Sequence, residues 1–114
     1  MLWAKAQFHG LHKWPDAPAS QQYLRELHKH CFNIRAGVQT EDSPIPLNAH
    51  SFQADLYKVI TTNVATAINK NRSMDCAAIA KLIGHSLCDL SYNVVFVSVA
   101  EDSETGVNVL FEKA

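Results

Sequence analysis

Alternating residues at the start of the chain predict a strand with one covered face. Between Leu2 and Phe8 the even positions are apolar, and polar residues hold most of the odd positions. Successive side chains of a strand point to opposite faces, so this alternation suits a half-buried strand. A second strand is predicted from Leu27 to Val38, and its even positions are apolar from Phe32 onward.

Apolar residues at steps of three and four predict two helices in the middle of the chain. The first begins near Asn48 or Ser51, either of which is a good N-cap, and ends at Asn69. The second begins after Asp75, another good N-cap, and runs to about Leu90. Proline-containing connections, Lys13 to Glu26 and Gln39 to Asn48, separate these elements.

Two further strands are predicted at the end of the chain, from Tyr92 to Val99 and from Val107 to Phe111. Ala100 to Gly106 would join them as a short acidic turn. The resulting order, ββααββ, predicts an α+β fold with a four-stranded antiparallel sheet and both helices on one face. With 114 residues the chain is expected to be a single domain. The sheet would have exposed edges, which favours a homo-oligomer.

Composition limits the function classes. The net charge of −1 gives no support to a nucleic-acid-binding surface. Apolar stretches are far shorter than a membrane span, and the first residues lack the layout of a signal peptide. Three cysteines at wide spacing indicate free thiols in a reducing compartment, so a cytoplasmic protein is expected.

Histidines at the start of the second strand are the main candidate for chemistry. His28 and His30 are two residues apart, so they share one strand face, with Lys29 and Cys31 on the other. Two imidazoles held in this way supply two of the three protein ligands of an open zinc site. The parity of the first strand favours His12 over His9 as the third ligand.

These motifs resemble the family of 6-pyruvoyl- and 6-carboxy-tetrahydropterin synthases, which has the tunnelling fold (T-fold). Members carry phenylalanine, three residues and histidine, matched here by Phe8 and His12. They continue with a histidine pair that opens a strand, then two helices, and then a strand ending in Val-x-Glu. The corresponding residues here are His28, His30 and Glu101. The similarity extends from Trp3 to Phe111 in the same element order.

The resemblance implies that His12, His28 and His30 bind zinc and that Glu101 anchors a pterin ring. A carboxylate accepts two parallel hydrogen bonds from the ring N–H and the exocyclic amine of a pterin or a guanine-like heterocycle. Glu104 lies in the same acidic segment and is the alternative ring anchor. Family members also form rings of subunits, so a hexamer or a trimer is expected.

Other family residues are missing from this chain. Leu24 stands where the family has its catalytic cysteine, and residues 69–74 contain no Asp-His pair to activate a thiol. Lys29 replaces the glycine between the paired histidines, and Asp75 replaces the ligand-binding threonine at the start of the second helix. Cys31 is expected to be an inert packed thiol. His50 and His85 are expected to be solvent-side helix residues.

Three hypotheses therefore stand. The first is a metal-bearing T-fold oligomer that binds a pterin-like or purine-like small molecule without the usual turnover. The second is a diverged zinc-dependent lyase of the tetrahydropterin synthase type that uses other residues as acid and base. The third is a structural or protein-binding module that has lost the site. The missing thiol and Asp-His pair favour the first hypothesis over the second.

Overall fold

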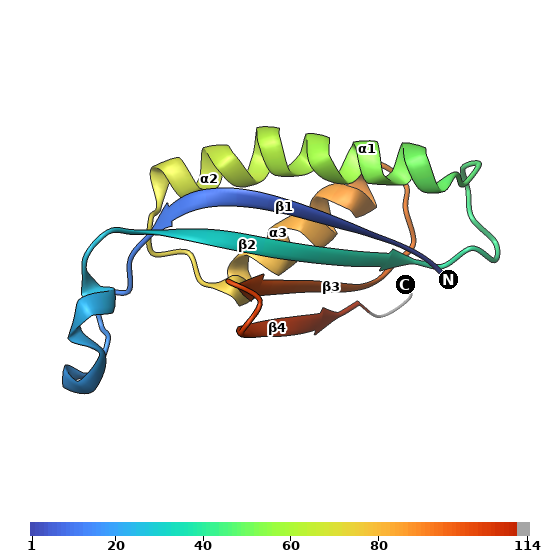
Figure 1. Cartoon of the computed structure of the whole chain (residues 1–114). Helices are drawn as coiled ribbons and strands as arrows, with labels where there is room; N and C mark the ends of the chain where they lie inside the picture. Colours follow the sequence, from blue (N-terminus) through green and yellow to red (C-terminus); the bar gives the residue numbers. More distant parts are fainter. Residues whose placement is uncertain (112–114) are drawn as a thin grey trace.

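Four strands form one antiparallel sheet in a computed structural model, which describes residues 1–111 without the side chains of Leu11, His12, Leu24 and His28. The strands are β1 (Leu2–His12), β2 (His28–Val38), β3 (Val94–Glu101) and β4 (Thr105–Leu110), and they neighbour one another in that order. The helices between β2 and β3 pack against one face of this sheet (Figure 1). The α+β class, the four-stranded antiparallel sheet and its two helices are thereby confirmed.

The helix-covered face of the sheet carries the apolar half of each alternating pattern. Ala4 and Ala6 of β1 are buried there, and so are Val97 and Val99 of β3. The even positions of β2 from Phe32 to Val38 are likewise buried, as the alternation predicts. His30 continues this face toward the start of β2, because it is two residues before Phe32.

The first predicted helix is a single long helix with an irregular centre. It consists of α1 (Ala49–Val59), the π-helical segment η2 (Ile60–Val64) and α2 (Ala65–Lys70), and Asn48 caps its start. Its buried side chains include a set at every fourth position: Phe52, Leu56, Ile60, Val64 and Ile68. Four residues of an α-helix turn about 40° more than one full revolution, so side chains at every fourth position would gradually rotate away from the sheet. The wider π-helical turn reduces that drift and keeps the stripe facing the core.

The second helix, α3 (Cys76–Asp89), begins and ends with recognisable caps. The Asp75 side chain accepts a hydrogen bond from the Ala78 N–H, which confirms the predicted N-cap. At the other end, Ser91 N–H donates to Cys88 and Tyr92 N–H donates to Leu87, which is a Schellman motif. Ser91 has a φ of 75° at the position where glycine is usual.

Some predicted boundaries were wrong near the last two strands. β3 begins at Val94 rather than Tyr92, because Tyr92 closes the Schellman motif and its buried hydroxyl donates to Asp55. β3 also continues through Ala100 and Glu101, so the turn that was expected from Ala100 to Gly106 is shorter. β4 accordingly begins at Thr105 and ends before Phe111. Glu101 is therefore a sheet residue and not part of the loop.

The connection between β1 and β2 forms an arm, residues 13–27, at the end of the sheet away from the N-terminus (Figure 1). It contains the 3₁₀ helix η1 (Ala19–Arg25) and exposes the large side chains of Trp14, Tyr23 and Leu27. The arm contributes to an elongated shape, with extents of 49 × 23 × 22 Å. Within residues 1–111, no helix is long and apolar enough to cross a membrane.

The other face of the sheet, which no helix covers, is largely polar. The Arg35 guanidinium stacks over the Trp3 ring at 4.5 Å, and Lys5 lies opposite Arg35 in the β1–β2 register. Gln7 donates to Asn33, which in turn donates to Ser103. A hydrogen-bonded polar surface of this kind is compatible with water, so the sheet needs no second layer on this side.

Candidate functional site

The β1–β2 register brings the three candidate histidine positions together at one end of the sheet. His12 lies directly opposite His28, and Gly10 lies opposite His30. Directly opposite residues of an antiparallel pair share a face, and so do residues two apart on one strand. The backbone thus assigns all three positions to the helix-covered face. The side chains of His12 and His28 lie outside the described part of the structure, so their contacts stay predictions.

His30 is held between two carboxylates. Its Nδ1 atom lies 2.7 Å from Oδ2 of Asp102, and its Nε2 atom lies 3.6 Å from Oε2 of Glu101. Carboxylate oxygens only accept hydrogen bonds, so Nδ1 is the nitrogen that donates to Asp102. The ring also meets Phe32 edge-on, and Nε2 is buried from solvent. These contacts fix the orientation of the ring.

The β3–β4 turn places Asp102 beside His30. Asp102 and Ser103 have φ values of 53° and 61°, and Glu104 N–H donates to the Glu101 carbonyl, as in a type I′ turn. Asp102 also makes two hydrogen bonds to the backbone of β2 at Cys31. Its N–H donates to the Cys31 carbonyl at 2.8 Å, and its Oδ1 accepts from the Cys31 N–H at 3.1 Å. One carboxylate oxygen thus binds the backbone of β2 while the other binds the histidine.

Glu101 also faces the start of α3. The Cys76 thiol, in the first turn of that helix, donates to Oε1 of Glu101 over 3.6 Å. Burial, with help from the Glu101 carboxylate, raises the pKa of this thiol from 9.0 to about 12. The thiol is therefore protonated at neutral pH and acts as a hydrogen-bond donor. It is not an activated nucleophile.

Asp75 precedes this thiol, and its carboxylate caps α3 on the exposed surface. Its predicted role in ligand binding stays a prediction. The segment between α2 and α3 lies against the end of β1, where Lys13 N–H donates to the Arg72 carbonyl at 2.8 Å. The start of α3 and the histidine end of the sheet are therefore neighbours.

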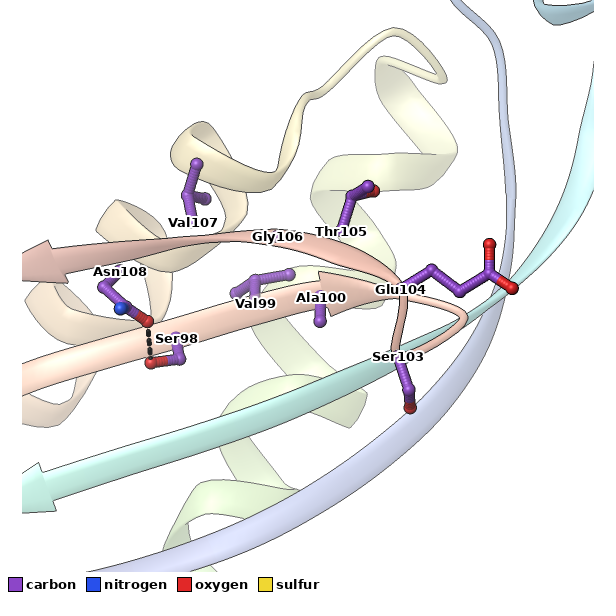
Figure 2. A pocket seen from close by; sticks show the side chains of 9 residues that line it. All are labelled: Ser98, Val99, Ala100, Ser103, Glu104, Thr105, Gly106, Val107 and Asn108. Atoms are coloured by element: carbon purple, nitrogen blue, oxygen red, sulfur yellow. Dashed lines mark hydrogen bonds between the residues drawn. The ribbon is translucent and has the colours of Figure 1, made fainter.

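Glu104, the alternative ring anchor, lies in a different environment from Glu101. It is exposed at the tip of the β3–β4 hairpin, and its side chain extends outward from the turn (Figure 2). It borders a shallow hollow of about 260 Å³ along β3 and β4, whose other walls are residues 98–100, 103 and 105–108. Neither His30 nor Glu101 lines that hollow. The geometry favours Glu101 over Glu104 as the anchor.

The remaining candidates lie outside this cluster. His9 and Cys31 are opposite each other on the uncovered sheet face, as strand parity predicts. His50 and His85 are exposed on helices, also as predicted. Leu24 falls within η1, but its side chain lies outside the described residues.

Two residues of the cluster were missed in the sequence. Cys76 directly follows the N-cap of the second helix, and this position at the helix end is the signal that could have indicated it. Asp102 was treated only as part of the acidic turn. The adjacent Glu101-Asp102 pair at a strand end is the signal that could have indicated two carboxylates at one site.

The chain matches no protein-family model, and no characterised protein shows a significant sequence match to it. Among the side chains that the structure describes, no group of three or more histidine, cysteine or acidic residues is arranged to hold a metal ion. Two of the three histidines at issue are not among those side chains.

Proposed function

We propose that this protein is a metal-bearing homo-oligomer of the T-fold type that binds a pterin-like or purine-like small molecule without the usual turnover. One observation carries the proposal: Oε2 of Glu101 lies 3.6 Å from Nε2 of His30. This contact is at the end of the sheet where the backbone of His12 lies opposite that of His28. A ring anchor and a histidine cluster would then be adjacent.

The proposed metal is zinc, with His12, His28 and His30 as ligands. The donor set supports this choice: three imidazole positions share one face of two paired strands, and the one described ring is anchored through Nδ1 by a carboxylate. Histidines that bind metal through one nitrogen usually donate the other N–H to such a partner. Bound zinc would polarise oxygens on the side chain of the ligand.

The proposed ring anchor is the Glu101 carboxylate. One of its oxygens faces Cys76 and the other faces His30. A thiol is a weak donor, so the N–H groups of a heterocycle are stronger partners for the same oxygens. Phe8 and Phe32 stack beside this end of the sheet with ring centroids 4.8 Å apart, and they provide an apolar wall.

The proposed lack of turnover rests on the acid–base groups. The family reaction moves protons at carbon atoms, which needs a general base with a pKa near the working pH. The Cys76 thiol is held protonated, and the Asp75 carboxylate is exposed and engaged as a helix cap. Leu24 has no ionisable group, so binding is favoured over the lyase alternative.

The proposed assembly is a ring of subunits, either a trimer or a hexamer. β1 and β4 are the outer strands of the sheet, and most residues of β4 are exposed. Joining such edges between copies would satisfy their backbone hydrogen-bonding groups. In a closed barrel the polar face with Lys5 and Arg35 would line a water-filled interior.

The test is metal analysis of the purified protein, combined with mass spectrometry of small molecules released from it. The proposal expects about one zinc per chain and a released heterocycle with a pterin-type or purine-type ring. Protein without metal or ligand, which also fails to take up added zinc, would instead support the structural-module hypothesis.

A further inference from the structure

Asp102 holds His30 through a hydrogen bond to Nδ1. We infer that Asp102 is a positioning residue that fixes the tautomer of His30, so that the lone pair that would bind a metal is on Nε2. This inference rests on the proposed function for its metal, but its claim about the tautomer holds for the metal-free protein as well.

The Asp102 carboxylate is held in place by several hydrogen bonds. Asp102 accepts from His30 Nδ1 at 2.7 Å and from the Cys31 N–H at 3.1 Å, with a different oxygen for each. The Asp102 N–H returns a hydrogen bond to the Cys31 carbonyl at 2.8 Å. Asp102 is thus attached to β2 through its backbone and its side chain, so the position of the oxygen that faces His30 is well defined.

The position of this carboxylate determines which imidazole nitrogen of His30 carries the proton. A neutral histidine carries one N–H, and its other nitrogen presents a lone pair. Carboxylates face both nitrogens of His30, but Asp102 is within hydrogen-bond distance of Nδ1, whereas Glu101 is 3.6 Å from Nε2, which is too far for a hydrogen bond. The proton is therefore held on Nδ1, and the lone pair is on Nε2. A metal needs such a lone pair, and partners of this kind usually change metal affinity by 10–100-fold when they are mutated.

One substitution at position 102 should change the tautomer of His30 without changing the shape of the side chain. Asp102→Asn keeps the size of the side chain and suits the φ of 53°, because asparagine tolerates the left-handed region. The Cys31 N–H requires an oxygen opposite it, so the amide nitrogen of Asn must face His30. That nitrogen donates, so Nδ1 becomes the acceptor and the proton moves to Nε2.

The first experiment uses the metal-free protein at pH 8. Two-bond ¹H–¹⁵N correlation spectra distinguish the two neutral tautomers of an imidazole from each other and from the imidazolium. His30 is expected to carry its proton on Nδ1 in the wild type and on Nε2 in Asp102→Asn. An unchanged tautomer in the variant, or an imidazolium in the wild type, would overturn the inference.

The second experiment measures zinc affinity by competition with a chromophoric chelator, along with the absorption spectrum of the cobalt-substituted protein. Asp102→Asn is expected to lose 10–100-fold in affinity. Glu104→Gln is the matched control, because it removes one negative charge from the same hairpin at an exposed position, beside a hollow that His30 does not line, and it is expected to bind zinc normally. Equal affinities in both variants, with the tautomer switched, would contradict the metal role of Asp102. If the wild type does not bind zinc, the proposed function fails, whereas the spectra still decide the tautomer.

Discussion

The Oε1 atom of Glu101 lies 3.6 Å from the Sγ atom of Cys76, so a strand end and a helix start share a thiol–carboxylate hydrogen bond. The pKa of the thiol is raised to about 12, chiefly by burial. We therefore expect Cys76 to react with iodoacetamide far more slowly at pH 8 than the exposed Cys88. Mass spectrometry of each alkylated peptide over time measures both rates. Equal rates would show that the thiol is not held protonated.

The same shift predicts how stability depends on pH. The pKa of the Cys76 thiol in the folded protein is above its ordinary value of 9.0. The contribution of the protonated thiol to the free energy of unfolding is therefore fully present below pH 9 and is lost as the pH rises toward 12. Cys76→Ser has no thiol to ionise and should lose less stability than the wild type across that range. Urea unfolding between pH 8 and 11 compares the two proteins. Parallel curves would contradict the assignment.

Removal of His28 or His30, two of the three proposed metal ligands, should abolish zinc binding. His28→Ala and His30→Ala are each expected to eliminate the metal content of about one zinc per chain, while circular dichroism shows that the fold persists. His50→Ala removes an exposed helical histidine and should retain the metal. Undiminished zinc in both strand variants, measured by mass spectrometry of the metal, would refute the histidine site.

The assembly prediction follows from the two outer strands. We expect a hexamer, or at least a trimer, by light scattering at micromolar protein concentration, because β1 and β4 otherwise leave backbone groups unpaired. A clean monomer at that concentration would count heavily against the T-fold assignment.

Binding and turnover should separate in activity measurements. The resemblance implies dihydroneopterin triphosphate as the substrate of an active enzyme, and we expect little conversion of it, since general acid–base catalysis typically supplies 10²–10⁴-fold in rate. We expect measurable affinity for a guanine-like or pterin-like ligand by calorimetry. Glu101→Gln should weaken this affinity, because an amide presents a donor toward the ring amine. Zinc-dependent product formation would overturn the expectation of little conversion. Equal ligand affinity in the wild type and in Glu101→Gln would overturn the role of Glu101 as the ring anchor. A loss of zinc in this variant would instead make Glu101 a metal ligand.

Much of the fold follows from local patterns. Period-two alternation predicted the buried face of β2. Cap residues predicted the start of the second helix at Asp75 and limited the start of the first to Asn48 or Ser51, of which Asn48 is the cap. Strand parity also placed His9 and Cys31 on the face opposite His30. These features depend on residues that are close in sequence, so one chain is enough to find them.

The contacts of the site were harder to predict, because they depend on where separate elements end. Asp102 reaches His30 only because β3 runs two residues further than expected and a tight turn with two positive φ values follows. Cys76 reaches Glu101 because α3 starts beside the end of β3. An offset of one or two residues at either boundary would separate these pairs, and boundaries are what sequence patterns specify least well.

The wide turn in the long helix has a consequence for the distant site. Each residue added to or removed from a helix rotates everything after it by about 100° and shifts it by about 1.5 Å. The segment from Ile60 to Val64 therefore sets the angle and height at which Lys70 leaves the helix. A short segment then connects Lys70 to Cys76, which lies beside Glu101. Within this segment the Arg72 carbonyl accepts a hydrogen bond from the Lys13 N–H. The winding of these five residues thus determines where the long helix ends, and it thereby aligns the start of α3 with the histidine end of the sheet.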